Sequence, residues 1–259
     1  MDAAAALTPA AAPVIRVRGF TKAYGRRPAV QSVDLTVERG EIFGLIGPDG
    51  AGKSSLMKAL AGVLVHDAGS VEVRGTLIDS ERAAERIKAR LGFMPQGLGL
   101  HLYPELSVEE NIDFFARLRL VPEAALAARK ARLLAITRLE RFRDRPMKQL
   151  SGGMKQKLGL ACTLLHEPEL VILDEPTTGV DPVSRRDFWR ILAELLGRGM
   201  SALVSTAYLD EASRFHRLAL VHDGRILAAG TPEALQQSVR GCVVRVRAGL
   251  QALDSGIPM

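Results

Sequence analysis

The segment from residue 47 to residue 54 combines closely spaced glycines with one lysine and one serine. It matches the pattern G-x-x-x-x-G-K-[ST] and, with the adjoining Ser55, reads Gly47-Pro48-Asp49-Gly50-Ala51-Gly52-Lys53-Ser54-Ser55. Such glycines let backbone amides surround phosphate groups, while the lysine bridges phosphate oxygens and the serine hydroxyl can ligate magnesium. An apolar run precedes the segment and a helix is expected after it. The segment therefore predicts binding of a nucleoside triphosphate, ATP, together with Mg²⁺.

Two adjacent carboxylates, Asp174 and Glu175, follow the apolar run from Leu170 to Leu173. The carboxyl end of a buried strand is where α/β proteins place ligands. Asp174 can hold magnesium through water, and Glu175 can polarise an attacking water. Alone, this pair could equally form a solvent-exposed turn. Beside a phosphate-binding loop it predicts a P-loop nucleoside triphosphatase in which Lys53 and Glu175 are catalytic.

A second anion-binding segment begins at Ser151 and continues with Gly152 and Gly153 at the start of an expected helix. It offers a hydroxyl, free backbone amides and the positive end of the helix dipole. A single nucleotide does not need two such segments unless one of them serves a partner subunit. The segment therefore predicts that the complete site is shared between two modules.

Together these motifs resemble those of ABC ATPases, in which the serine-glycine-glycine signature closes over ATP bound by the opposite subunit. Gln96, in Phe-Met-Pro-Gln, is similar to the Q-loop glutamine of that family, and Asp181 to the D-loop aspartate. Tyr24 precedes Gly47 by 23 positions and resembles the aromatic residue that stacks on adenine. The resemblance spans residues 14 to about 235. It implies that Gln96 acts in catalysis, and that Ser54, Gln96 and Asp174 hold Mg²⁺.

Three segments, which begin at Ser151, Gly179 and Ser205, have amino-acid sequences similar to those of ABC-2-type multidrug exporters. It most resembles the first ATPase half of tandem-ATPase export proteins in Gram-negative bacteria. This resemblance implies a pair of ATPase modules that sandwich two ATP molecules and drive a separate ABC-2-type membrane permease. The second module would be another copy of this chain or a tandem or heteromeric partner.

The chain departs from the family pattern at Ala207. ABC ATPases commonly carry a histidine at this third position of the segment Ser205-Thr206-x-Tyr208, where it contacts the γ-phosphate. A methyl group donates no hydrogen bond, and loss of one such donor typically costs about 3–4 kcal/mol of transition-state stabilisation. We therefore expect firm ATP binding with slow hydrolysis. The nearby His216 and His222 lie in the wrong sequence context to replace the missing group.

The expected fold class is α/β, a P-loop NTPase with a RecA-like, mostly parallel core and an antiparallel β edge, as in ABC ATPases. Several apolar runs are continuous, which is typical of buried parallel strands. We predict strands at Val14–Phe20, Val33–Val37, Ile42–Ile46, Ser70–Arg74, Leu91–Met94, Leu170–Leu173, Ala202–Ser205 and Leu218–Val221.

A helical subdomain is expected within residues 97–150, inserted between core segments 14–96 and 151–240. Ser107-Val-Glu-Glu is a capping box that predicts a helix through about Leu118, and Pro122 begins a second helical stretch to about Leu139. We expect a disordered, Ala/Pro-rich tail over residues 1–13 and a C-terminal tail over residues 241–259.

The composition indicates a globular protein, with 47% hydrophobic and 25% charged residues. No run of 18 apolar residues is present, and the two cysteines resemble neither a metal site nor a disulfide framework. The segment from Arg117 to Lys148 holds ten basic and three acidic residues, more than the net excess of the whole chain. We expect a peripheral protein on the cytoplasmic face of the inner membrane, whose anionic lipids this segment could meet, unless it is only a solvated face.

Two other functions remain open from the sequence. The basic segment would also suit a soluble ABC ATPase that acts on nucleic acid or ribosomes. Only 55 positions separate Gln96 from Ser151 and only one module is present, so no specific nucleic acid is expected. Ala207 would suit a slow nucleotide-sensing regulatory module, although such a module would not need Glu175.

Overall fold

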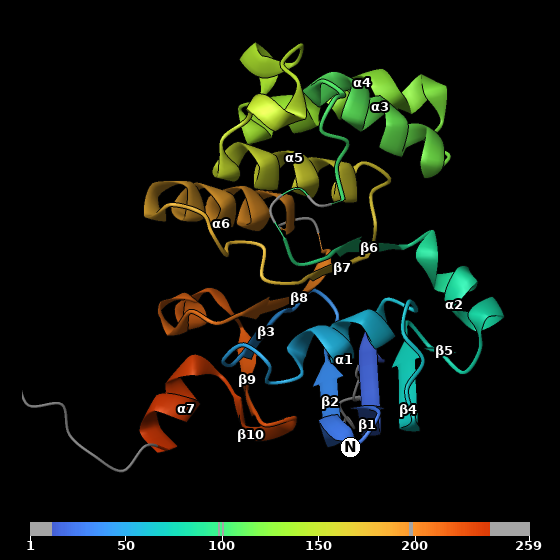
Figure 1. The fold of residues 1–259 in the computed structure, drawn as a ribbon, viewed down its shortest axis with the longest axis vertical. Coiled ribbons are helices and arrows are strands. Elements are labelled where there is room, and N and C mark those ends of the chain that lie inside the picture. The colour runs from blue at the N-terminus through green and yellow to red at the C-terminus, as the bar shows by residue number, and fades with distance from the viewer. Residues whose placement is uncertain (1–11, 98, 100, 197–198, 239–259) are drawn as a thin grey trace, which may run out of the picture.

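The computed structural model describes residues 12–97, 99, 101–196 and 199–238 (Figure 1). The tails predicted at residues 1–13 and 241–259 therefore lie outside the described residues, apart from Ala12 and Pro13. No helix in the described ranges has the length and apolar character needed to cross a membrane.

A six-stranded sheet forms the centre of the molecule, with the order β10-β9-β3-β8-β7-β6. Its strands are parallel except β10, which pairs antiparallel with β9. All four residues of β7 are buried, as expected for a parallel strand covered on both faces. The strands are β3 (Ile42–Ile46), β6 (Leu91–Met94), β7 (Leu170–Leu173), β8 (Ser201–Thr206), β9 (Arg217–His222) and β10 (Arg225–Gly230).

The other strands form a separate four-stranded antiparallel sheet with the order β2-β1-β4-β5. The predicted antiparallel β edge is present at β10 of the parallel sheet, whereas β1 and β2 belong to the separate antiparallel sheet. Side chains of β1 tend to alternate between buried and more exposed, which suits a sheet packed on one face only. The strands are β1 (Ile15–Tyr24), β2 (Arg27–Val37), β4 (Ala68–Val73) and β5 (Thr76–Leu77).

Helices cover both sheets. The buried face of the antiparallel sheet packs with α1 and with strands of the parallel sheet in one hydrophobic cluster. The helices of the core are α1 (Lys53–Leu60), α2 (Glu81–Lys88), α5 (Gly152–Leu164), α6 (Pro182–Leu196) and α7 (Pro232–Ser238). The described part of the chain also contains the 3₁₀ helices η1 (Glu140–Phe142), η2 (Met147–Gln149) and η3 (Leu209–Arg214).

A helical lobe containing α3 (Val108–Leu118) and α4 (Glu123–Thr137) lies above the parallel sheet in Figure 1. The predicted capping box is present: Ser107 Oγ accepts from the Glu110 amide, and a Glu110 carboxylate oxygen accepts from the Ser107 amide. The second helix begins directly after Pro122, as predicted, and ends two residues before Leu139. The exact limits of a helical subdomain at residues 97–150 stay a prediction.

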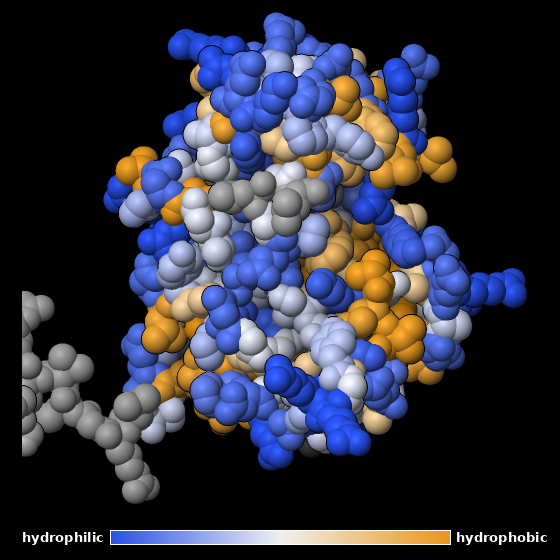
Figure 2. Space-filling view, viewed as in Figure 1, coloured by the Kyte–Doolittle hydropathy of each residue, from blue (hydrophilic) through white to orange (hydrophobic). Residues whose placement is uncertain are grey.

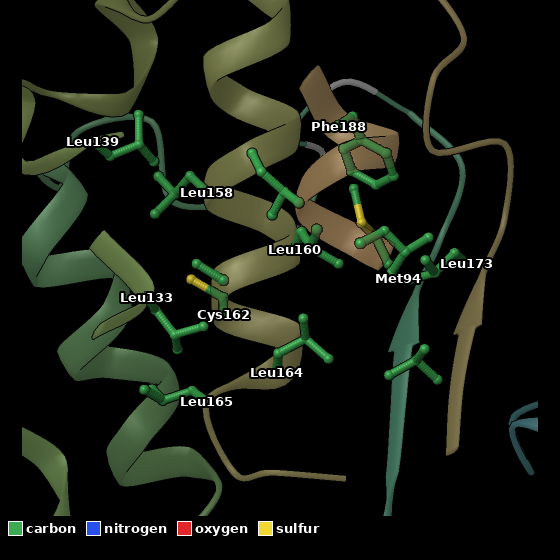
Figure 3. Packing of buried hydrophobic residues seen from close by; sticks show 14 of the residues in the cluster. Met94, Leu133, Leu139, Leu158, Leu160, Cys162, Leu164, Leu165, Leu173 and Phe188 are labelled. Atoms are coloured by element: carbon green, nitrogen blue, oxygen red, sulfur yellow. The ribbon is translucent and has the colours of Figure 1, made fainter. Parts of the chain in front are cut away.

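Helix α5 connects the lobe to the core. Figure 3 shows Leu158, Leu160, Cys162 and Leu164 on α5, with Leu133 of α4 on one side and the β6 and β7 strands on the other. All these side chains belong to a single hydrophobic cluster. The helix that begins at the serine-glycine-glycine segment is therefore packed against both the lobe and the sheet.

Candidate functional site

The loop from Gly47 to Ser54 joins the carboxyl end of β3 to the amino end of α1, as predicted. Gly52 has φ +97°, and a Cβ there would lie 2.3 Å from the Ala29 carbonyl oxygen. A Cβ on Gly47 would lie 2.1 Å from the Val221 carbonyl oxygen. Both contacts are prohibitive, so the tight course of this loop requires glycine at these two positions.

Lys53 is the first residue of α1, and its side chain turns back over the loop. Its Nζ donates to the carbonyl oxygens of Gly47 at 2.7 Å and Pro48 at 2.9 Å. The same Nζ lies 3.0 Å from Oε1 of Glu175, and both side chains are only 3% exposed. The cation is therefore held at the centre of the loop, beside the carboxylate expected to act on water.

Asp174 and Glu175 directly follow β7, beside the end of β8. Ser205 Oγ donates to Asp174 Oδ1 at 2.7 Å and accepts from the Glu175 amide at 2.8 Å. Burial raises the pKa of Asp174 above its usual range, although the hydrogen bond from Ser205 lowers it. Asp174 Oδ2 is buried and has no hydrogen-bond partner among the described residues. A buried carboxylate oxygen with spare acceptor capacity, next to Ser54, suits a hydrated cation.

Glu175 is held by three further contacts. Gln96, which follows β6, donates from Nε2 to Glu175 Oε2 at 2.8 Å, and Thr178 Oγ1 donates to the same oxygen at 3.2 Å. The backbone of Glu175 has φ +47°, in the left-handed region that non-glycine residues seldom adopt. Strain at this position is maintained by surrounding contacts, a pattern that favours a functional role for the side chain.

Lys53, Gln96 and Glu175 line one cleft of about 310 Å³, together with the glycine-rich loop. Tyr24 lies at its edge, 53% exposed, with its hydroxyl 3.2 Å from Ser55 Oγ. The cleft thus combines the glycine-rich loop with an exposed aromatic ring. Its lining comprises Tyr24, Ala29, Asp49, Gly50, Ala51, Gly52, Lys53, Ser54, Ser55, Gln96 and Glu175.

The serine-glycine-glycine segment lies elsewhere. Ser151 caps α5, and its Oγ accepts from the Met154 amide at 3.3 Å, while Asp181 caps α6 by accepting from the Val183 and Ser184 amides. Both residues are exposed. Of the residues that the structure describes, neither Ser151, Gly152 and Gly153 nor Asp181 lines the cleft around Lys53.

Ala207 follows β8 and is exposed. His216 accepts from the Ile42 amide through Nδ1, at the amino end of β3 and therefore away from the phosphate loop. His222 forms an ion pair with Asp223 when protonated. Neither histidine is part of the cleft lining in the described chain.

Sequence reasoning assigned Ser205 and Thr178 no role at the site. Ser205 contacts both carboxylate residues from a neighbouring strand, and only the sheet order reveals that proximity. Behind them, Oε1 of buried Glu211 accepts from Thr177 Oγ1 and Trp189 Nε1, each at 2.9 Å. The loop after Glu175 is thereby joined to α6 and η3.

Comparison with known proteins agrees with this geometry. The family model described as "ABC transporter" matches residues 30–178, more than half of the chain. A Nod factor export ATP-binding protein I from Ralstonia nicotianae is 37% identical over 233 residues, covering 90% of this chain and 71% of the relative. The chain belongs to the ABC transporter ATP-binding family. Its members are ATPases, and this chain carries their nucleotide-binding fold.

Other ABC relatives extend the comparison. A probable multidrug ABC transporter ATP-binding protein, YbhF of Escherichia coli K12, is 47% identical over 230 residues, which cover 88% of this chain and 39% of the relative. The chain therefore spans about two fifths of the length of that relative. A daunorubicin resistance ATP-binding protein, DrrA3 of Streptomyces coeruleorubidus, is 40% identical over 88% of this chain and 71% of the relative.

Solved ABC structures share the fold. CbiO1 from Clostridium perfringens, part of an ABC transporter complex, has a TM-score of 0.80 at 26% identity, covering 88% of this chain and 92% of that one. The dimeric ATP-binding cassette MJ0796 in a post-hydrolysis state with ADP and Pi has a TM-score of 0.76 at 24% identity, covering 84% and 98%. The predicted ABC ATPase fold is confirmed.

Proposed function

We propose that this ABC ATPase binds ATP with Mg²⁺ and powers export through a separate membrane permease. The observation that carries the proposal is that Gln96, which follows β6, and the adjacent Asp174 and Glu175, which follow β7, meet at the loop that carries Lys53. Relatives whose names include multidrug ABC transport, Nod factor export and daunorubicin resistance support the export assignment.

Magnesium would be held by Ser54, Gln96 and Asp174. Asp174 Oδ2, which has no hydrogen-bond partner among the described residues, supports this assignment, because a buried carboxylate oxygen otherwise loses hydration without compensation. Bound Mg²⁺ would neutralise charge on the phosphates. Gln96 would then have two tasks, because its side chain also holds Glu175.

Glu175 would polarise the attacking water. Contacts from Lys53, Gln96 and Thr178 hold its two carboxylate oxygens in place, which supports a role that depends on orientation. Asp174 would serve the metal, while Lys53 would bind the phosphates and Tyr24 would stack on the adenine. The two neighbouring carboxylates would thus have different tasks because their surroundings differ.

Two modules would be needed for a complete site. The exposed position of Ser151 and Asp181, away from the cleft lining, supports their use on a nucleotide held by a second module. The helix dipole and free amides at the start of α5 favour an anionic phosphate there. The second module would be another copy of this chain or a tandem partner.

Hydrolysis at this loop would be slow, because Ala207 supplies no hydrogen-bond donor. Both histidines nearest in sequence are engaged elsewhere, which supports this view. The phosphate loop, Lys53 and the carboxylates retain the groups needed for binding. The chain would therefore combine secure ATP binding with reduced transition-state stabilisation.

The permease would contact the side of the molecule where core and lobe meet. Figure 2 shows hydrophobic surface on the right of this face, between the α2 region and the helical lobe. Exposed apolar side chains occur after α1, at Val63 and Val65, and at the end of α3, at Leu118 and Leu120. Apolar surface of this kind commonly marks a protein contact.

Attachment to the cytoplasmic face of the inner membrane would depend mainly on this permease. The basic segment is less available than its sequence suggests, because six of its ten cations lie within ion-pair distance of acids. These six are Arg129, Lys130, Arg132, Arg138, Arg143 and Lys148. The exposed Arg141 and Arg145 are better placed to meet anionic lipid.

Co-purification tests the proposal. The chain would be expressed with a candidate multi-span permease found by a search of the neighbouring coding sequence, purified through a tag on this chain, and reconstituted into lipid vesicles. We expect a stable complex whose ATPase activity exceeds that of the chain alone. The Lys53→Ala variant should retain the complex and lose the activity. Absence of both a complex and stimulation would reject a role in powering this permease.

A further inference from the structure

A cavity of about 340 Å³ lies where the antiparallel sheet, the helical lobe and the parallel sheet meet. The antiparallel sheet contributes Arg74, which follows β4, and the helical lobe contributes Arg132 of α4. The parallel sheet contributes Met200, which precedes β8. This volume falls within the range of about 300–1,000 Å³ that is typical of small-molecule sites. The cavity is separate from the nucleotide cleft and shares none of its lining residues.

The polar lining of the cavity is predominantly cationic. Four arginines and two glutamates contribute to it: Arg39, Arg74, Arg129, Arg132, Glu167 and Glu169. Arg129 forms an ion pair with Glu167 at 2.6 Å, and Arg74 pairs with Glu169. Glu169 Oε1 also lies 3.6 Å from Nε of Arg90, a residue that does not line the cavity. The two glutamates therefore cannot balance the four guanidinium groups.

Two of these arginines keep donor capacity. Arg132 Nη1 lies 3.9 Å from Glu167 Oε1, beyond hydrogen-bond distance, and Arg132 Nε is buried without a partner in the described chain. Arg39 donates from Nε to the Ala12 carbonyl oxygen at 3.1 Å, and its terminal nitrogens have no ion-pair partner among the described carboxylates. A guanidinium with free N–H groups is well suited to a carboxylate or phosphate.

The remaining wall of the cavity is apolar. Leu133 of α4 and Leu164 and Leu165 at the end of α5 line it, each no more than 5% exposed, together with Met200. An inorganic anion would leave these side chains unused, and a neutral hydrocarbon would leave the arginines without a counter-ion. The pairing of spare guanidinium donors with aliphatic walls matches a ligand that has both parts.

We propose that this cavity binds an anionic amphiphile, with a carboxylate or phosphate head at Arg39 and Arg132 and an apolar tail along the leucines. A ligand in this cavity would not contact ATP bound in the nucleotide cleft. The phosphate loop and Asp174 follow the carboxyl ends of the parallel strands, whereas Glu169 and Met200 precede their amino ends. A four-residue strand spans roughly 13 Å, so the two ligands would not touch.

Isothermal titration calorimetry on the full chain tests the proposal, with ligands kept below their micelle concentrations. Sodium dodecanoate and dodecyl phosphate are the two probes, because they separate a fatty carboxylate from a lipid phosphate. We expect at least one to bind in a one-to-one complex, with or without saturating ATP. Dodecanol and inorganic phosphate should bind at least tenfold more weakly. Octanoate should lose about fourfold per missing methylene group.

Variants locate the site. Arg132→Gln and Arg39→Gln should each weaken binding by about tenfold, as expected for loss of a charge-assisted hydrogen bond. Arg18→Gln, an exposed arginine on β1 away from the cavity lining, is the matched control and should bind normally. Met200→Trp should block the cavity without changing its charge. Unchanged ATP affinity would verify that each variant is folded.

Any one of five results would overturn the proposal. Binding of neither probe would exclude this ligand class, and equal binding of dodecanol would indicate an unspecific apolar surface. Displacement of the probe by ATP would show that the probe binds in the nucleotide cleft. Equal loss in Arg18→Gln and Arg132→Gln, or full binding by Met200→Trp, would place the ligand outside this cavity.

Discussion

Lys53 Nζ lies 3.0 Å from Oε1 of Glu175, inside a site where each side chain is 3% exposed. A triphosphate would require the same ammonium group, so the carboxylate and the phosphates compete for it. Glu175→Gln removes the competing charge. We expect ATP to bind several-fold more tightly to this variant, while turnover falls by a factor on the order of a hundred or more.

Equilibrium binding of a fluorescent ATP analogue and steady-state phosphate release would check both halves of this prediction. Glu169→Gln is a suitable control, because Glu169 lies at the opposite ends of the strands and outside the cleft. Weaker nucleotide binding by Glu175→Gln would contradict the competition between carboxylate and phosphate.

Ser205 should strengthen Mg²⁺ binding at Asp174. Its Oγ orients Asp174 and supports the backbone of Glu175, so Ser205→Ala removes two hydrogen bonds between buried groups. We expect the Mg²⁺ concentration for half-maximal activity to rise, and the free energy of unfolding to fall by about 1–3 kcal/mol. Ser201→Ala, at the other end of β8, should leave the Mg²⁺ titration unchanged. A parallel shift in both variants would indicate general destabilisation of the strand.

Mixing two inactive variants would determine which nucleotide Ser151 serves. In a dimer of this chain, Lys53→Ala and Ser151→Arg would each disable both sites. A mixed dimer would contain one site with both defects and one intact site. If Ser151 acts on the partner's nucleotide, activity should return on mixing, to roughly a quarter of the wild-type value when pairing is random and sites are independent. Inactivity of purified mixed dimers would show that Ser151 serves the loop of its own chain.

Ala207→His should accelerate hydrolysis by restoring one donor at the terminal phosphate. The energetic value of such a donor predicts a gain approaching a hundred- to thousand-fold in turnover, with a smaller change in ATP affinity. Ala207→Leu adds bulk without a donor and should not accelerate the reaction. An unchanged rate in Ala207→His would mean that the missing group does not limit this ATPase.

Glu109 should stabilise the helical lobe in a pH-dependent manner. Its carboxylate accepts two hydrogen bonds from Arg143, at 2.6 and 2.8 Å, and lies 2.8 Å from Lys130 Nζ. Hydrogen bonds from Arg143 and then Lys130 lower the pKa of Glu109 to about 2. Because the folded pKa is lowered, the contribution is complete above the ordinary pKa of a glutamate and is lost as pH falls towards 2.

Urea denaturation at several pH values would test this dependence. Glu109→Gln should lower the free energy of unfolding by roughly 1 kcal/mol at pH 7, and the difference from wild type should shrink below about pH 4. Glu105→Gln removes the partner of Lys148 at a 76% exposed position and should have little effect. A pH-independent difference in Glu109→Gln would point to lost packing and not to lost charge.

Local patterns predicted eight of the ten strands in the described chain, the starts of α3 and α4, and the phosphate loop, because each depends on neighbours in sequence; β5 and β10 were missed. The capping box at Ser107 and the glycine at position 52 are of this kind. The pairing of β1 with β4 and the contact of Ser205 with Asp174 depend on sheet order, which hydrophobic pattern leaves open. For the same reason, the charge of Arg129 appeared free until the fold brought Glu167 beside it.

The hydrogen bond from Trp189 to Glu211 makes the indole ring a fluorescent probe of the loop that follows Glu175. The chain contains a single tryptophan. Its Nε1 donates to the carboxylate oxygen that also accepts from Thr177, two residues beyond Glu175. Any rearrangement of the catalytic loop that shifts Thr177 would change the polarity around one indole ring. Tryptophan fluorescence could therefore follow rearrangements of this loop during the ATPase cycle in unlabelled protein, through a single indole ring.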